Sequence, residues 1–235
     1  MQCFLCKESF PEFAPAGLCP HCGSKPEHRL QFLLLARTVK LKATDKILSV
    51  GASEPELRYI AQHSTPAKVT AIDLRDRTFH SILKLPHRAM QMDVTHLAFS
   101  DHCFDLILCG GVLPFIRSDY LAISEAHRAL KGEGLALMTV KMLLPKSRRA
   151  SELHGEDPKA YPRAFLDQNG DEWLYGPDFF ERVEAAGFFF HRLAAGAWLE
   201  SSVRVEQGIP DALELILCFK FRDAKERFLK EAGLG

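Results

Sequence analysis

Three stretches with a shared pattern decide the fold: Lys46–Leu57 (KILSVGASEPEL), Lys68–Leu74 (KVTAIDL) and Phe104–Gly111 (FDLILCGG). Each begins with a short apolar run, and each run ends at a glycine or an aspartate. Short apolar runs that end at turn residues are typical of strands buried on both faces. The pattern therefore predicts a buried sheet whose strand ends carry small or acidic residues.

Strands and helices alternate along most of the chain. Gly132 and Gly134 predict a turn before the fifth strand. Strands that alternate with helices form a parallel sheet with helices on both faces, and ligands of such sheets bind at the carboxyl ends of the strands. We predict strands at Lys46–Val50, Lys68–Ile72, Arg88–Met92, Phe104–Cys109 and Leu135–Val140, and helices at Glu54–His63 and Tyr120–Leu130.

The C-terminal part departs from this alternation. A helix is predicted at Pro177–Ala186 and ends at Gly187, and two strand-like stretches follow at Phe188–Ala194 and Leu213–Phe221. No helix of the usual crossover length separates these two stretches, so we expect them to pair as antiparallel strands. The predicted fold class is α/β, with a mostly parallel, Rossmann-like sheet and a C-terminal antiparallel strand.

The residues at the strand ends suit a nucleotide-containing cofactor. Gly51 follows the first strand, where the chain turns sharply and passes close to a ligand. Asp73 ends the second strand, where a carboxylate can accept hydrogen bonds from two ribose hydroxyls. Asp93 ends the third strand, and its carboxylate and the Val94 amide are placed to meet an adenine edge. The fourth strand leads to a platform of small residues, namely Cys109, Gly110 and Gly111.

Four segments between Lys46 and Val140 resemble a known family: ILSVGASEPEL, AIDL, MDVTHLAFSDHCFDLILCGGVLPFI and EAHRALKGEGLALMTV. They are similar to the core of the class I S-adenosylmethionine-dependent methyltransferases of the type 11 kind. CPHCGSKPEHR and YGPDFFERVEAAGF further resemble a bacterial subgroup with an N-terminal cysteine-rich ribbon. The resemblance implies the methyltransferase sheet, S-adenosylmethionine as cofactor and methyl transfer as the activity. It assigns the cofactor loop to Gly51, Ala52 and Ser53, the ribose contact to Asp73 and Leu74, the adenine contact to Asp93 and Val94, and the strand-four motif to Cys109, Gly110 and Gly111.

The chain departs from the family pattern in two places. The cofactor loop has one glycine, Gly51, where the family has three in a G-x-G-x-G pattern. A Glu-His pair that follows strand four in many relatives is replaced by Pro114 and Phe115, so no general base is predicted. Methyl transfer can proceed without a base, because the sulfonium methyl group is electrophilic and alignment of the acceptor lowers the barrier. His154 is considered for proton removal, but no residue is assigned a catalytic role.

Two Cys-x-x-Cys pairs lie near the N-terminus, formed by Cys3, Cys6, Cys19 and Cys22. Four thiolates at this spacing predict a tetrahedral zinc site, and disulfides or free thiols are the alternatives. Protein would fill every coordination position, which indicates a structural or recognition role. Residues 1–26 hold few large apolar side chains, so the metal would replace the missing core. We expect His21 to be exposed, and we expect the aromatic residues to pack on the protein body or, alternatively, to touch a substrate; these are Phe4, Phe10 and Phe13.

The sequence divides into a cysteine module at residues 1–26 and a methyltransferase-like domain at residues 27–235. Glu27–Val39 predicts an amphipathic helix that joins the two. Residues 141–175 form a long polar connection after the fifth strand, which predicts a lid or substrate-binding element. The basic side chains of this segment suit an anionic metabolite or RNA, the alternative being an ordinary solvated loop; they are Lys141, Lys146, Arg148 and Arg149.

The composition limits the partners of the protein. The 235 residues carry 30 basic and 30 acidic side chains, so the formal net charge is zero. Nucleic-acid binding usually requires a basic excess, and a small-molecule substrate is therefore preferred to RNA. The richest apolar run, Leu30–Ala36 (LQFLLLA), is far shorter than the roughly 20 residues that cross a bilayer, so we expect a cytoplasmic protein without a membrane partner. The oligomeric state is not predicted.

Two other function classes stay open at the level of sequence. The altered loop and the missing base also fit a non-catalytic protein of the methyltransferase fold that uses its cysteine module for docking. The order of strand, loop and acidic residue also occurs in nucleotide-dependent oxidoreductases. Those enzymes carry a G-x-G-x-x-G turn, which is absent after Val50, so we rank the oxidoreductase last.

Overall fold

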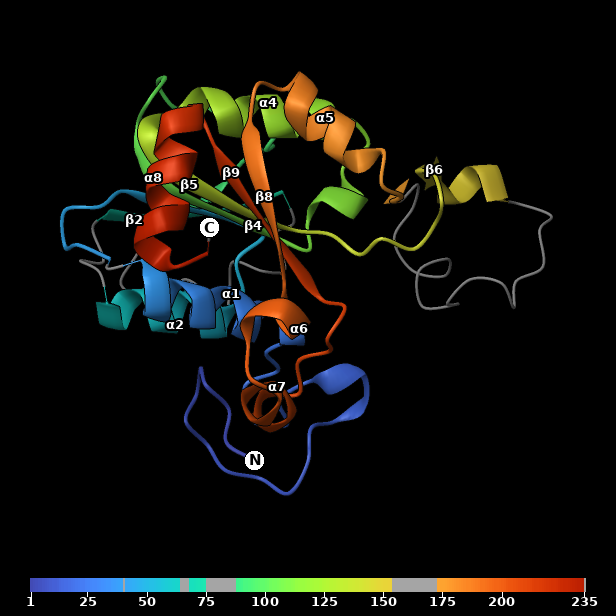
Figure 1. Cartoon of the computed structure of the whole chain (residues 1–235). Coiled ribbons are helices and arrows are strands. Elements are labelled where there is room, and N and C mark those ends of the chain that lie inside the picture. Colours follow the sequence, from blue (N-terminus) through green and yellow to red (C-terminus); the bar gives the residue numbers. More distant parts are fainter. Residues whose placement is uncertain (40, 64–67, 75–87, 154–172, 235) are drawn as a thin grey trace.

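The computed structural model describes residues 1–39, 41–63, 68–74, 88–153 and 173–234 (Figure 1). The helices are α1 (Pro26–Thr38), α2 (Glu54–His63), α4 (Asp119–Ala129), α5 (Phe179–Ala185), α6 (Ala195–Trp198), α7 (Ser201–Gln207) and α8 (Arg222–Ala232). Short 3₁₀ turns lie at η1 (Pro15–Gly17), η3 (Leu113–Phe115) and η4 (Ala150–Leu153). The strands are β1 (Ile47–Val50), β2 (Val69–Asp73), β3 (Arg88–Gln91), β4 (Phe104–Gly110), β5 (Leu130–Thr139), β6 (Arg148–Arg149), β7 (Trp173–Leu174), β8 (Phe189–Ala194) and β9 (Glu214–Phe219).

Seven strands form one sheet in the order β3-β2-β1-β4-β5-β9-β8. The pairs from β3 to β5 are parallel, and β9 lies antiparallel to both β5 and β8. The predicted α/β fold with one C-terminal antiparallel strand is therefore confirmed. The chain runs from β1 outward to β3 and then returns to β4 beside β1. In open α/β sheets the ligand crevice lies at such a reversal of strand order.

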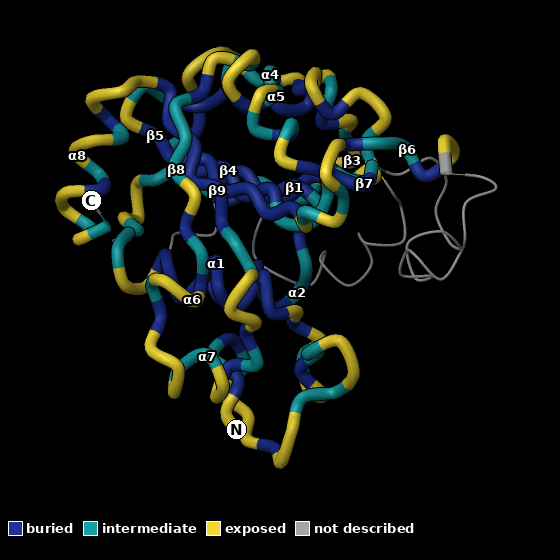
Figure 2. Tube along the Cα trace, turned by 45° about the vertical axis from the view of Figure 1, so that its right-hand side comes forward, coloured by how far each residue is buried: buried dark blue, intermediate teal, exposed yellow. Residues whose placement is uncertain are grey.

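Alternate residues of the strands enter two separate cores. In β4, Leu106 and Leu108 pack toward α1 and α2, whereas Ile107 and Cys109 pack toward α4 and α5. Figure 1 shows α1 and α2 on one side of the sheet and α4 and α5 on the other, and Figure 2 shows the central strands as buried. Among the described residues, no helix combines the length and the apolar character needed to cross a bilayer.

Helix α1 differs from the amphipathic helix that we predicted. Every residue from Pro26 to Leu35 is buried, including the polar residues Glu27, Arg29 and Gln31. The apolar side chains pack in the core beneath the sheet, and Arg29 faces the cysteine module. The amphipathic pattern was wrong because the polar side chains are buried as well: Arg29 lies against the cysteine module, and Gln31 lies beside Gly110 of β4.

The turn predicted at Gly132 and Gly134 lies at an irregularity of β5. This strand begins at Leu130, directly after α4, and it advances from Leu130 to Leu135 while its partner β4 advances only from Phe104 to Leu106. A Cβ at Gly132 would lie 2.8 Å from the Phe221 ring, and a Cβ at Gly134 would lie 2.7 Å from a methyl group of Leu130. Both glycines are therefore closely packed where the strand departs from regular pairing. The highly charged helix α8 was not predicted at all, since only Ala224 and Leu229 of it are buried.

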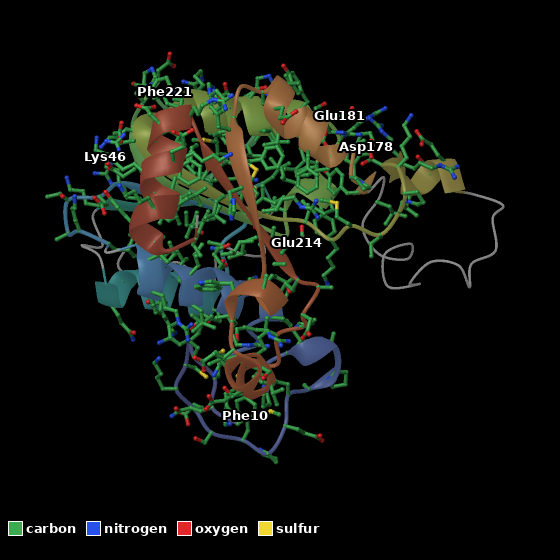
Figure 3. All side chains as sticks on the ribbon, in the orientation of Figure 1. Phe10, Lys46, Asp178, Glu181, Glu214 and Phe221 are labelled. Atoms are coloured by element: carbon green, nitrogen blue, oxygen red, sulfur yellow. The ribbon has the colours of Figure 1, made fainter. Side chains whose placement is uncertain are left out.

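The aromatic side chains of the cysteine module pack as predicted. Phe4 lies 5.7 Å from the Tyr59 ring of α2, measured between ring centroids, and Phe10 lies 4.8 Å from Phe13. Phe10 is buried within the module (Figure 3). His21 is exposed, as expected.

One buried cation joins the module to the rest of the chain. The Arg29 guanidinium is fully buried and donates to the carbonyl oxygens of Ser24, of Gly17 (2.6 Å) and of Gln207 (2.7 Å). Its guanidinium carbon also lies 4.1 Å from the centre of the Phe13 ring. Gln207, at the end of α7, accepts from the Phe4 amide and donates to the carbonyl of residue 2, both at 2.8 Å. The module, α1 and α7 are thus held together by a single hydrogen-bond network.

We expect Arg29→Met to lower the free energy of unfolding by at least about 3 kcal/mol, because three carbonyl oxygens lose a charged donor. Urea denaturation measures this change. Arg58→Met is the control, since it removes an exposed ion pair with Glu54 and should cost about 0.5 kcal/mol or less. Equal stability of the two variants would contradict the structural role of Arg29.

Candidate cofactor-binding site

A cavity of about 540 Å³ lies at the carboxyl ends of β1, β2, β3 and β4. Its position is the reversal point of the strand order, between β1 and β4. The volume is within the range of pockets that hold small molecules and cofactors. The lining residues are Val50, Gly51, Ile72, Asp73, Leu74, Met92, Asp93, Val94, Thr95, Gly111, Val112, Phe115, Ile116, Arg117 and Ser118.

The structure brings together most of the residues proposed from sequence. Those that line the cavity are Gly51, Asp73, Leu74, Asp93, Val94 and Gly111. Four others are not among its lining residues, namely Ala52, Ser53, Cys109 and Gly110. Burial raises the pKa of Cys109 to about 12, so this thiol stays neutral and takes no part in proton transfer.

Gly51 occupies the position where the loop requires glycine. Its φ is +63°, and its amide donates to the Ile72 carbonyl at 2.8 Å. A Cβ at Gly51 would lie 2.4 Å from Cγ2 of Val112, which is closer than real Cβ atoms approach. The following helix α2 begins at Glu54, so Pro55 lies in its first turn, where proline is tolerated. The loop therefore requires glycine at position 51, where Val112 packs against the backbone.

Asp73 and Asp93 end adjacent strands and face the same cavity. Asp93 Oδ1 accepts hydrogen bonds from the amide and the hydroxyl of Thr95, both at 2.8 Å. These bonds fix the carboxylate, and its Oδ2 has no hydrogen-bond partner among the residues that the structure describes. The Asp73 carbonyl accepts from the Met92 amide at 3.1 Å, which holds the two strand ends together.

One wall of the cavity was missed by the sequence analysis. Phe115, Ile116, Arg117 and Ser118 form this wall, in the segment that connects β4 to α4. The Arg117 carbonyl accepts a hydrogen bond from Trp173 Nε1 at 3.2 Å. No residue type in this segment signals a cofactor, so only the three-dimensional contacts reveal the wall.

Residues 141–175 were predicted to form a lid. The structure describes the two ends of this segment, residues 141–153 and 173–175. Strands β6 and β7 pair as a small antiparallel sheet beside the cavity wall. The Ser147 amide donates to Asp178 Oδ1 at 2.6 Å, and the Gly176 amide donates to Ser147 Oγ at 3.0 Å (Figure 3 labels Asp178). His154 lies outside the described residues.

Tyr175 anchors this segment to the core. Its hydroxyl lies 2.9 Å from Asp119 Oδ2 and 3.1 Å from the Leu113 carbonyl, and Asp119 also pairs with Arg182 at 2.7 Å. Burial and the Asp119 carboxylate raise the pKa of Tyr175, so its hydroxyl stays protonated. Tyr175 therefore holds this segment against the core, and its protonated hydroxyl does not supply a base.

A second, smaller cavity of about 120 Å³ adjoins the first. Gly111 and Phe115 line both cavities, so the two meet at the end of β4. Glu27, which is 8% exposed, lines it, and so does Lys141, the only one of the four predicted basic residues to line either cavity. The remaining lining residues are Lys25, Pro114, Thr139, Val140, Leu143, Trp173 and Leu213.

The four N-terminal cysteines converge on one point. Their sulfur atoms lie within 4.8 Å of one another, with 3.9 Å between Cys3 and Cys22 and 3.7 Å between Cys6 and Cys19. A tetrahedral zinc ion with Zn–S bonds of about 2.3 Å has its sulfurs about 3.8 Å apart. The geometry therefore fits a tetrahedral metal ion.

The comparisons with known proteins agree with this geometry. Residues 48–138 match the family described as a methyltransferase domain. That stretch includes β1 to β4 and most of β5, together with the loops of the large cavity. Over these residues the chain is similar to that family, and its sheet has the Rossmann-like methyltransferase fold. A sequence comparison with curated proteins gave no match.

Solved structures share the fold at low sequence identity. The YcgJ protein of Bacillus subtilis is 14% identical, with a TM-score of 0.54 over 82% of this chain and 98% of that one. An S-adenosylmethionine-dependent methyltransferase of Mesorhizobium loti is also 14% identical, with a TM-score of 0.56 over 78% and 95%. The [4+2]-cyclase SpnF is 17% identical, with a TM-score of 0.53 over 81% and 79%.

Proposed function

We propose that the protein transfers a methyl group from S-adenosylmethionine to a small molecule by in-line displacement. The observation that carries this proposal is the large cavity itself, which places the tight Gly51 turn opposite two carboxylates at the ends of β2 and β3. A cofactor that contains a nucleoside needs these features: a loop that it can approach closely and acceptors for its hydroxyl and amino groups. The cofactor, when bound, supplies an electrophilic methyl group on a sulfonium.

The residues of the chain bind and orient this cofactor. Asp73 accepts hydrogen bonds from the ribose hydroxyls, and Gly51 allows the backbone to approach the ligand. Asp93 Oδ2 and the Val94 amide offer one acceptor and one donor to the adenine edge. Gly111 leaves the junction between the two cavities open, since a Cβ there would meet no atom within 4 Å.

The second cavity is the proposed site of the methyl acceptor. It shares the lining residues Gly111 and Phe115 with the first cavity, so an acceptor there would lie next to the cofactor. Its walls are largely apolar and its volume is small, which favours a small molecule over RNA. Glu27 is the one carboxylate among the described lining residues of this cavity, and we propose that it accepts a proton from the acceptor. Apart from this proton transfer, the rate would depend on how well the acceptor is aligned with the methyl group. This is expected for a reaction with a reactive electrophile.

We expect Asp73→Ala to weaken the binding of S-adenosylhomocysteine by about tenfold to a hundredfold, because the ligand loses hydrogen bonds to a charged group. Isothermal titration calorimetry measures the change. Asp223→Ala, which removes an acidic residue from the exposed face of α8, is the control and should bind like the parent protein. Unchanged affinity in Asp73→Ala would rule out the ribose contact.

We further propose that Cys3, Cys6, Cys19 and Cys22 hold a structural zinc ion. Burial raises the pKa of Cys6 and Cys22, and a bound divalent cation would allow these thiols to ionise. Four sulfur ligands leave no position for water or substrate, so the ion would stabilise the module without taking part in the reaction.

Cys19→Ser should abolish the zinc content, measured by mass spectrometry of the metal, and should lower the thermal midpoint of unfolding. Cys103→Ser is the control, since Cys103 lies in the methyltransferase domain and outside the cysteine cluster. One zinc ion per chain in both variants would contradict the assignment of the ligands.

A further inference from the structure

The second cavity has a rim of exposed apolar side chains. Phe115 and Leu143 line the cavity and are 44% and 36% exposed. Trp173 lines it as well, and its Nε1 donates to the Arg117 carbonyl at 3.2 Å, which fixes the ring. Apolar side chains that stay exposed around a cavity indicate that a ligand covers them. A ligand of this cavity therefore needs an apolar body.

Three charged side chains line the same cavity, namely Lys25, Lys141 and Glu27. Among the described residues, neither Lys25 nor Glu27 forms an ion pair, so both charges are available to a ligand. The lining has one net positive charge, although the formal net charge of the whole chain is zero. Walls of low dielectric constant concentrate the field of such charges, so the cavity attracts a ligand with a negative charge.

The Trp173 ring does not offer a site to a cationic ligand. The guanidinium carbon of Arg182 lies 3.9 Å from the centre of this ring, and that of Arg149 lies 5.0 Å from it. A cation is attracted to the face of an aromatic ring, but here two arginines of the chain already lie over the ring. Their charges also repel an ammonium group. Trp173 therefore supplies apolar contact, and the charges around it disfavour an amine.

We propose that the methyl acceptor is a small organic acid whose carboxylate is bound by Lys25 and Lys141. Its apolar body packs against Phe115, Leu143 and Trp173. A carboxylate has one negative charge, which balances the net charge of the lining, whereas a phosphate monoester has nearly two at neutral pH. This inference rests on the proposed function, because it names the substrate class of the same site.

Glu27 determines the orientation of such an acid. Its carboxylate is 8% exposed and repels a second carboxylate in the same small cavity. The acid group therefore lies toward the lysines, and the other end of the acceptor lies toward Glu27. That end carries the hydroxyl or amino group that is methylated, beside the residue proposed to accept its proton.

The test uses the fluorescence of Trp173 in the full-length, metal-loaded protein. The chain has two tryptophans, so Trp198→Phe leaves one, in the wall of the cavity. The probes are cyclohexanecarboxylate, the uncharged cyclohexanecarboxamide and the cationic cyclohexylmethylamine. We expect the acid to bind about fivefold or more tightly than the amide, and the amine to bind most weakly. Ligand-observed NMR on the parent protein measures the same ratios without the Trp198 substitution.

Four variants then locate the charge. Lys25→Met and Lys141→Met should each weaken the acid by about threefold or more and leave the amide unchanged. Lys46→Met is the matched control, because Lys46 is exposed just before β1, at the opposite end of the sheet from the cavity, and it should bind all probes like the parent protein. Glu27→Gln should bind the acid at least as tightly as the parent protein does.

The outcomes separate this inference from the proposed function. If S-adenosylhomocysteine binds but the acid is not preferred to the amide, or both lysine variants weaken acid and amide equally, the acid site is overturned and the function stands. Preference for the amine, with a loss in Glu27→Gln, overturns it in favour of an amine acceptor. Tighter binding of cyclohexyl phosphate overturns the carboxylate. Lysine-dependent binding of the acid without binding of S-adenosylhomocysteine overturns the proposed function and leaves an acid-binding cavity.

Discussion

The buried guanidinium of Arg29 is the interaction on which the rest of the structure depends. Its hydrogen bonds run to the carbonyl oxygens of Ser24, Gly17 and Gln207, so one side chain fixes the cysteine module, α1 and α7. A buried charge keeps its donors satisfied only while these segments stay in place. Helix α1 then continues beneath the sheet, and its N-cap residue Lys25 and its first-turn residue Glu27 line the second cavity. The cysteine module thereby helps to position a wall of the candidate active site.

The sequence predicted the fold correctly where one local pattern repeats along the chain, namely a short apolar run followed by a small or acidic residue. Short apolar runs such as Ile47–Val50 are strands because their residues are buried on both faces, and the acidic and small residues that follow them meet at one edge of a parallel sheet. The same rule gave wrong predictions where packing between elements that are distant in the sequence determines the local structure. Gly132 packs against the Phe221 ring in an irregular part of β5, and Arg29 of α1 is buried against the cysteine module.

The altered cofactor loop is less of a departure than its sequence suggests. The one glycine that it retains, Gly51, is where the backbone has a positive φ and where Val112 leaves no room for a Cβ. Ala52 is buried, so a small side chain is accommodated next to it. The fold alone does not determine the reaction, as the similarity to a [4+2]-cyclase illustrates. Methyl transfer is therefore proposed from the residues that line the cavity and from the ligand that fits them.

Calorimetric titration of the parent protein with S-adenosylmethionine and S-adenosylhomocysteine, with NADH as a control, tests the central claim most directly. We expect both sulfur-containing ligands to bind at one site per chain with micromolar affinity, and we expect no binding of NADH. Absence of binding by the first two would contradict it and would leave a non-catalytic protein of the same fold, whereas binding of NADH alone would indicate an oxidoreductase.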